Sequence, residues 1–290
     1  MNTQPGLNNR YHKKSRKRSR KVRRRRRFLF FTVIIIVCIS IVRNIQNKPS
    51  RNNAAHDGSP ATLASTNSSK PSSDREKSAR KDFIICIDPG HGYDDPGCDS
   101  EYLGEYDEAD INLSISQLIK DKLQKQGFTV IMTRDSDTKP EDHKASNSMY
   151  TINSKERCEF SNNNGADLFL SIHCNYFKDK DVSGTRLYYY VDNTETTEAY
   201  ANLLENGINN ILGEECLVSA NARNESYDVC YFTKAPAVLA EVGFVTNPGD
   251  AKKLLDSKWQ NKYAESIVEG MINYFKEFCY NADTGVKNAK

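Results

Sequence analysis

Three polar side chains lie at or just beyond the ends of short apolar segments, and together they could do the chemistry of a metal hydrolase. They are His91, His173 and Glu241. The apolar segments beside them cover residues 83–87, 168–172 and 237–240. Short apolar runs of this kind are typical of buried parallel strands, and sites in open α/β sheets form beyond the carboxyl ends of such strands. Two imidazoles and a carboxylate at that place could bind a metal ion and activate water.

Only two of the five histidines have this placement. His12 and His56 lie in the N-terminal region, and His143 lies in a polar stretch. A single histidine at a strand end is usually a hydrogen-bonded structural residue, but two at separate strand ends with carboxylates nearby favour a metal site. The chain has no HExxH motif, which excludes the helical zinc motif of many metallopeptidases.

The third metal ligand has four carboxylate candidates that are close to His91 in sequence. They are Glu105, Asp107, Glu108 and Asp110, at the start of a predicted helix. Spacing alone does not choose among them. The alternative is the ordinary role of acidic residues at a helix N-terminus, where they interact favourably with the helix dipole.

Glu241 is predicted to be a buried carboxylate, because apolar residues surround it in the segment 237–244. A carboxylate in an apolar strand is costly unless it is paired or functional. Burial would raise its pKa toward the range that general acid–base catalysis needs. The alternative is a structural glutamate held in a salt bridge.

The order of the predicted elements indicates the fold class. Strands are expected at residues 83–87, 128–133, 168–173, 185–191, 229–232 and 237–244. Helices are expected at residues 107–126, 154–163, 196–212 and 259–278, with a further short helix capped by Asp250. This alternation predicts a single three-layer α/β domain over residues 82–280, with a mostly parallel, twisted sheet flanked by helices.

The N-terminal region differs from this body in charge. Residues 1–81 carry 21 Lys and Arg and 3 Asp and Glu, whereas residues 82–290 carry 20 and 35. A basic tail at 1–27 precedes fifteen uncharged, mostly apolar residues that begin at Phe28. We expect residues 28–43 to form an uncleaved membrane anchor with the basic tail in the cytoplasm. A cleaved signal peptide is the less favoured alternative, because no small-residue cleavage site follows directly.

Disordered segments are expected on both sides of the body. Residues 44–81 are rich in Ser, Asn, Lys and Pro and poor in large apolar residues, which predicts a disordered linker, and residues 281–290 form a second disordered tail. The anchor and linker together would hold the body outside the cell membrane. The acidic body argues against binding of nucleic acid, and a nucleic-acid-binding tail would not explain the apolar run.

Seven of the eight cysteines lie outside the apolar run, and no two form a CxxC pair. A structural zinc finger is therefore not expected. Cys86, inside a predicted strand, is expected to be a buried apolar residue. A Cys216–Cys230 disulfide stays an open possibility.

Five motifs occur in order along the body. They are Ile87–Gly92, Glu108–Leu113, Thr133–Arg134, Ala166–Asn175 and Pro236–Phe244. With these motifs, residues 83–278 resemble the zinc-dependent N-acetylmuramoyl-L-alanine amidases of the type 3 catalytic family. The stretch between Arg134 and Arg157 is longer than is usual in this family, so a loop at 135–153 is expected to cover or widen the cleft.

The resemblance implies one Zn²⁺ per chain, bound by His91, Glu108 and His173. It implies that Glu241 is the catalytic acid and base, and that Arg157 has a supporting role. Cys174 stands where the family commonly has a small residue, and strand alternation points its side chain away from the metal.

The implied reaction is hydrolysis of the amide bond between the lactyl group of N-acetylmuramic acid and the L-alanine of the peptidoglycan stem peptide. Such an enzyme would remodel or degrade the cell wall. Two other classes stay open, namely a catalytically silent or regulatory wall-binding module that kept the fold, and a zinc carboxypeptidase or other peptidase that uses similar ligands. The sequence indicates no protein activator and no oligomeric state.

Overall fold

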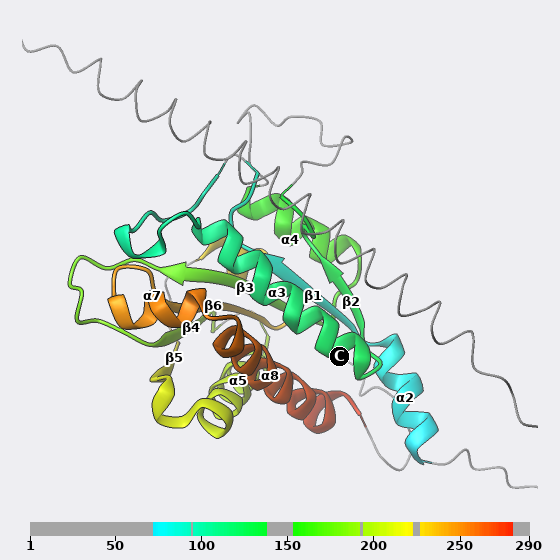
Figure 1. Cartoon of the computed structure of the whole chain (residues 1–290). Coiled ribbons are helices and arrows are strands. Elements are labelled where there is room, and N and C mark those ends of the chain that lie inside the picture. The colour runs from blue at the N-terminus through cyan, green and yellow to red at the C-terminus, as the bar shows by residue number, and fades with distance from the viewer. Residues whose placement is uncertain (1–71, 94, 138–152, 192–193, 223–226, 281–290) are drawn as a thin grey trace, which may run out of the picture. The chain divides into compact units, whose positions relative to one another are not determined.

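The computed structural model of the chain describes residues 72–93, 95–137, 153–191, 194–222 and 227–280 (Figure 1). The predicted tail, anchor, most of the linker, most of the 135–153 loop and the C-terminal tail lie outside these residues. Within them, no helix is both long enough and apolar enough to cross a membrane.

Six strands form one sheet in the order β2-β1-β3-β6-β4-β5. Their bounds are β1 Ile84–Pro89, β2 Thr129–Met132, β3 Leu168–Asn175, β4 Thr185–Tyr189, β5 Val218–Ala222 and β6 Ala237–Phe244. Strands β1, β2, β3 and β6 are parallel, whereas β4 pairs antiparallel with β6 and parallel with β5. The expected mostly parallel sheet is confirmed, and the carboxyl ends of β1, β3 and β6 meet at one edge.

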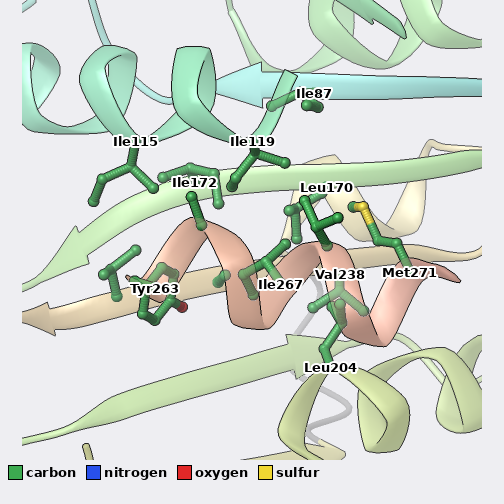
Figure 2. Close-up of a cluster of buried hydrophobic side chains, with 14 of the residues drawn as sticks. Ile87, Ile115, Ile119, Leu170, Ile172, Leu204, Val238, Tyr263, Ile267 and Met271 are labelled. Carbon is green, nitrogen blue, oxygen red and sulfur yellow. The ribbon is translucent and has the colours of Figure 1, made fainter. Parts of the chain in front are cut away.

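The helices are arranged on the two faces of this sheet. Their bounds are α2 Ser72–Asp82, α3 Glu108–Lys125, α4 Ser154–Asn163, α5 Thr197–Leu212, α6 Asp228–Tyr231, α7 Pro248–Leu255 and α8 Ser257–Tyr274, with short turns η1 Glu101–Leu103, η2 Gly213–Glu215 and η3 Phe275–Cys279. Helices α3, α5 and α8 cover one face. Their apolar side chains meet alternate residues of the strands in the main core cluster (Figure 2), which includes Ile87, Ile119, Leu170, Leu204, Val238 and Ile267.

The other face packs against α4 and α6 in a second, smaller core cluster. Phe169 of β3 and Leu239 of β6 point to this side, where they meet Cys158 of α4 and Cys230 of α6. The two clusters use alternate residues of the same strands, as the two-residue period of a strand requires. Helices on both faces make the three layers that the sequence predicted.

Residues 229–232 are not the strand that the sequence predicted. They lie in and just after α6, in which the N–H groups of Cys230 and Tyr231 donate to the carbonyl of Tyr227. Periodicity cannot assign so short an apolar run to a strand or a helix. The strand that the sequence missed is β5, in which only Val218 has a large apolar side chain and the other residues are Ser, Ala and Asn.

The predicted cap of α7 is also wrong, by three residues. Asn247 is the N-cap, and its side chain accepts a hydrogen bond from the N–H of Asp250. The Asp250 carboxylate instead accepts from the N–H groups of Gly184 and Phe244. It therefore joins the loop before β4 to the end of β6.

The expected disorder over residues 44–81 is wrong for its last part, because α2 begins at Ser72. Arg80 attaches this helix to the body. Its guanidinium carbon lies 5.2 Å from the ring centroid of Phe128, and its Nη1 donates to the carbonyl of Gln126. Contacts with the body thus stabilise a polar helix that would be marginal alone.

The structure excludes the open Cys216–Cys230 disulfide. Cys216 belongs to the main core cluster and Cys230 to the second, on opposite faces of the sheet, and both are free thiols. Cys86 is fully buried, as predicted for a small apolar residue.

Candidate metal centre and active site

The turn after β1 holds His91 in a strained backbone conformation. Its φ of 58° lies in the left-handed region, which residues with a side chain rarely adopt. Buried Arg134 donates to the carbonyls of Pro89 and Gly90. Buried Arg157 donates to the carbonyls of Pro89 and His91. Two arginines from outside the turn therefore stabilise the conformation that presents the His91 side chain.

Arg157 also forms a buried ion pair with Asp88. Its Nη1 lies 2.6 Å from Asp88 Oδ1, and the hydroxyls of Thr133 and Ser171 donate to the same carboxylate. Burial raises the pKa of Asp88, but the charge of Arg157 and these hydrogen bonds outweigh it, so the pKa is lowered overall. The charged Asp88 ties the end of β1 to α4 and β3.

Replacing Asp88 with Asn is expected to destabilise the fold by about 3–5 kcal/mol at pH 7, because Arg157 stays buried without its counter-charge. The folded pKa of Asp88 is below its unfolded value of about 3.9. Its contribution is therefore present at higher pH and is lost as the pH falls through the folded value. Urea unfolding of both proteins, at pH 7 and at falling pH, measures the loss and its pH dependence.

The control for this measurement is Asp135→Asn, which changes an exposed carboxylate. It should leave stability unchanged at each pH. An Asp88→Asn protein as stable as the wild type at pH 7 would contradict the role given to the ion pair.

His91, Glu108 and His173 come together at the carboxyl edge of the sheet. Glu108 Oε1 lies 3.2 Å from His91 Nε2 and 3.2 Å from His173 Nδ1. One ligand atom from each residue lies within 4.8 Å of the others, so the three side chains could hold a metal ion. A tetrahedral zinc site with bonds of about 2.0–2.2 Å places its ligand atoms roughly 3.3–3.6 Å apart. The spacing in the cluster fits such a site.

Glu108 is fixed in this cluster by three hydrogen-bond donors. Its Oε1 accepts from the N–H of Cys174 at 3.0 Å and from Asn112 Nδ2 at 3.3 Å. Its Oε2 accepts from the N–H of Cys98 at 2.6 Å. Burial raises the pKa of Glu108, but hydrogen bonds and charge from the two histidines outweigh it and hold the pKa well below its usual range. The side chain is therefore an ionised carboxylate in a fixed position, where it could serve as a metal ligand.

Asp95 orients His91 from the other side of the imidazole ring. Its Oδ2 lies 2.8 Å from His91 Nδ1, which leaves Nε2 facing Glu108. A carboxylate on the second nitrogen of a histidine ligand is common around metal sites. Burial lowers the pKa of His91, but Asp95 and Glu108 outweigh it and raise the pKa to about 9. The two carboxylates thus favour positive charge at the His91 ring, whether it comes from a proton or from a metal ion.

Gly90 leaves the space that the ring of His173 fills. A Cβ atom at Gly90 would lie 2.2 Å from His173 Nε2, which is closer than the two atoms can approach. Gly90→Ala is therefore expected to displace the ring, weaken metal binding and lower activity by about 10²-fold, the cost of misplacing a reacting group by about 1 Å. Titration of metal-stripped protein and an assay of the reloaded enzyme measure the two effects.

The matched control for Gly90→Ala is Gly249→Ala. A Cβ atom there meets only the Asn247 side chain, at 3.1 Å, and is far from the cluster in sequence and in its contacts. Metal affinity unchanged in Gly90→Ala would mean that the ring of His173 can move without loss of the site.

Glu241 lies beside the cluster, on β6. It pairs with His173 in the β3–β6 register, so both side chains point to the same face. Its Oε2 is buried and has no hydrogen-bond partner among the described residues, which does not fit the salt-bridged alternative. Burial raises the pKa of Glu241 to about 7; Glu108 adds to the rise, and the two histidines oppose it. A carboxyl group of this kind can exchange a proton near neutral pH.

The structure distinguishes among the four carboxylates that sequence spacing left as candidates for the third metal ligand. Glu108 alone joins the two histidines. Glu105 is exposed, and the side chain of Asp110 accepts a hydrogen bond from the N–H of Asp107 at the start of α3. Burial of its side chain therefore distinguishes Glu108 from the other three carboxylates.

Four further residues have roles that the sequence did not reveal or only partly revealed. Cys174 is buried on the opposite face, as strand alternation predicted, yet its N–H donates to Glu108. Asp95 was missed, although an acid four residues after His91 was a usable signal. Asn112 lies in the Glu108–Leu113 motif, but its hydrogen bond to Glu108 was not foreseen. Arg134 lies in a recognised motif, but its part in holding the turn could not be read from that motif.

The comparisons with known proteins agree with this geometry. The family described as N-acetylmuramoyl-L-alanine amidase matches residues 85–273. A germination-specific N-acetylmuramoyl-L-alanine amidase of Bacillus subtilis (strain 168) is 36% identical over 196 residues, which cover 67% of this chain and 80% of that protein.

Solved structures show the same fold. The crystal structure of an N-acetylmuramoyl-L-alanine amidase from Clostridium difficile 630 has a TM-score of 0.59 at 30% identity and covers 67% of this chain and 97% of that one. The CwlD amidase from Clostridioides difficile, solved in complex with the GerS lipoprotein, has a TM-score of 0.60 at 28% identity, with 67% and 98% covered. The resemblance carried by the five motifs is confirmed. This chain belongs to the family of N-acetylmuramoyl-L-alanine amidases, which are hydrolytic enzymes of peptidoglycan.

Proposed function

We propose that this enzyme uses one zinc ion per chain to hydrolyse the amide bond between the lactyl group of N-acetylmuramic acid and the L-alanine of the stem peptide. The observation that carries the proposal is the buried, unpartnered Glu241 oxygen beside the His91, Glu108 and His173 cluster. Two imidazole nitrogens and one carboxylate are a donor set of catalytic zinc sites, which keep a fourth position for water.

The ligand side chains are positioned by the protein itself. Bound zinc would polarise the amide carbonyl and lower the pKa of a water molecule toward ~7. Asp95 holds Nδ1 of His91, so that Nε2 is presented to the site. Glu108 offers an oxygen that is ionised at neutral pH, and His173 presents Nδ1 from the end of β3.

Glu241 would move the proton in both halves of the reaction. It takes a proton from the attacking water and then delivers that proton to the departing nitrogen of L-alanine. Because the pKa of Glu241 is about 7, both protonation states are accessible near neutral pH. The products are a lactyl carboxylate on the sugar and a free amino group on the stem peptide.

The proposal includes a location outside the cytoplasmic membrane of a bacterial cell. The basic flank and the apolar run at residues 28–43 support an uncleaved anchor. Secretion after cleavage is the alternative, and N-terminal sequencing of the protein from membrane and medium fractions distinguishes the two. Because the related CwlD amidase is solved with a lipoprotein, a lipoprotein partner is part of the same proposal.

Mass spectrometry of purified muropeptides tests the reaction. The full chain, purified in detergent and stripped of metal, is incubated with them with and without added zinc. Zinc-dependent release of free stem peptide that begins at L-alanine is expected. Cleavage inside the peptide would make the protein a peptidase, and zinc binding without any cleavage would favour the silent or regulatory module.

A further inference from the structure

An arginine lies opposite Glu241 on the next strand. Strand β4 pairs antiparallel with β6, and Arg186 is the register partner of Glu241. Leu187 is buried in the main core cluster and Tyr188 in the second. Strand alternation therefore turns Arg186 toward the face that carries Glu241. Register partners of this kind have Cα atoms about 5 Å apart, so Arg186 borders the site directly.

Phe244 sets the direction of the Arg186 side chain. The guanidinium carbon lies 5.5 Å from the centroid of the Phe244 ring. In the β3–β6 ladder, His173 pairs with Glu241. The next pair, after an irregularity, is Asn175 with Phe244, so β6 has one extra residue there. Such a bulge returns Phe244 to the face of Glu241, and the Arg186 side chain leans along that face toward the carboxyl edge.

Arg186 has no carboxylate partner among the residues that the structure describes. Its Nη1 donates to the carbonyl of Thr185, and none of the ion pairs in the described ranges involves it. The carboxylate of nearby Asp250 is occupied by the N–H groups of Gly184 and Phe244. Residues 82–290 hold 35 acidic side chains against 20 basic ones, so a half-buried arginine without an acid stands out.

We propose that Arg186 binds a carboxylate of the stem peptide and thereby sets which peptides the enzyme prefers. This inference rests on the proposed function. The metal ligands come from the turn after β1, from α3 and from β3, so the acyl part of the substrate lies over that side. The departing nitrogen must lie within reach of Glu241, and the peptide attached to it extends toward β4. The second stem residue is a glutamate linked through its side chain, and its α-carboxylate, free or amidated, lies close to that nitrogen.

An arginine stacked on an aromatic ring suits this task. The planar guanidinium presents paired N–H donors that match the two oxygens of a carboxylate. Contact with the Phe244 ring holds the cation in place before the substrate arrives. Among the described residues Arg186 forms no ion pair with Glu241, whose Oε2 has no hydrogen-bond partner. Arg186 is therefore a specificity-determining residue and not a proton donor.

Binding of two probes that differ in one group tests the inference. The probes are N-acetylmuramoyl-L-alanyl-D-glutamate and its α-amide, N-acetylmuramoyl-L-alanyl-D-isoglutamine. Calorimetry on the zinc-loaded full chain with Glu241→Gln, which prevents turnover, is expected to show about tenfold tighter binding of the carboxylate probe. Adding Arg186→Gln should remove the preference by weakening only that probe, and Arg186→Lys should retain part of it.

The matched control is Lys155→Gln, which removes one exposed positive charge from α4. It should leave the preference unchanged. Two results would overturn the inference. One is equal affinity of the Glu241→Gln protein for the two probes, which includes no affinity for either. The other is an equal loss of affinity for both probes when Arg186→Gln is added. In turnover with Glu241 intact, Arg186→Gln should raise KM for the carboxylate substrate and leave kcat unchanged. No turnover with a retained preference would refute the proposed function and not the role of Arg186.

Discussion

Replacing Glu241 with Gln is expected to lower kcat by about 10²- to 10⁴-fold, the usual contribution of a general acid–base group. The substitution keeps the shape of the side chain but removes its ability to take up a proton. Because Glu241 is not one of the three clustered ligand residues, one zinc ion per chain should remain bound. Steady-state kinetics on muropeptides, with metal content measured on the same sample, checks both statements.

The pH dependence of the wild-type enzyme gives a second test of Glu241. Burial raises its pKa to about 7, and only the deprotonated form can accept a proton from water. The value of kcat/KM should therefore fall as the pH falls through the pKa of Glu241, and bound zinc would move this limb to lower pH by favouring the carboxylate. Glu265→Gln, on the exposed side of α8, is the control and should behave as the wild type. Full activity of Glu241→Gln would rule out the proposed acid–base role.

Replacing His173 with Ala is expected to remove both the metal and the activity. His173 Nδ1 lies 3.2 Å from Glu108 Oε1, so its loss leaves two of the three ligands. Removal of a residue that only supports a ligand lowers metal affinity by about 10- to 100-fold. Removal of a ligand itself should lower metal affinity by more than this. Zinc content after dialysis, zinc titration of the stripped protein and the muropeptide assay are the measurements.

Loss of folding has to be separated from loss of the site in this variant. His173 is only partly buried at the edge of the sheet, so its truncation opens no cavity in the core. The melting temperature of the metal-free His173→Ala protein should therefore match that of the metal-free wild type. His56→Ala, in the N-terminal region, is the control with normal metal content. Normal zinc content in His173→Ala would remove this residue from the proposed ligand set.

The elements with large apolar residues at regular spacing could be predicted from the sequence. Helix α3 buries Ile111, Ile115, Ile119 and Leu123, which recur every four residues. The first five residues of β3, 168–172, are apolar apart from Ser171, because both faces of the strand are covered by helices. Where this signal was weak, prediction failed. β5 has only one large apolar residue, Val218, and the four residues of α6 are too few to show a period.

The candidate site was predictable only in part, because several of its contacts join residues that are far apart in the sequence. Residues at strand ends can be recognised from sequence, which brought His91, His173 and Glu241 together correctly. The choice of Glu108 depended on which helix position faces inward, and only the resemblance to a family settled it. The hydrogen bonds of Arg134 and Arg157 to the turn join residues about 45 and 68 positions apart, and no local pattern reports such contacts. The catalytic and metal-binding roles themselves stay predictions.

Helix α2 and the catalytic edge lie at opposite ends of the same strand. The helix leads directly into the start of β1 (Figure 1). The candidate site lies beyond the other end of that strand, which is Pro89. The six residues of β1 span roughly 20 Å at about 3.3 Å per residue. A segment joined ahead of α2 therefore begins far from the proposed catalytic residues. Evolution could combine this catalytic domain with an anchor, a secretion signal or a wall-binding repeat. A reporter protein fused ahead of α2 should leave the enzymatic activity unchanged.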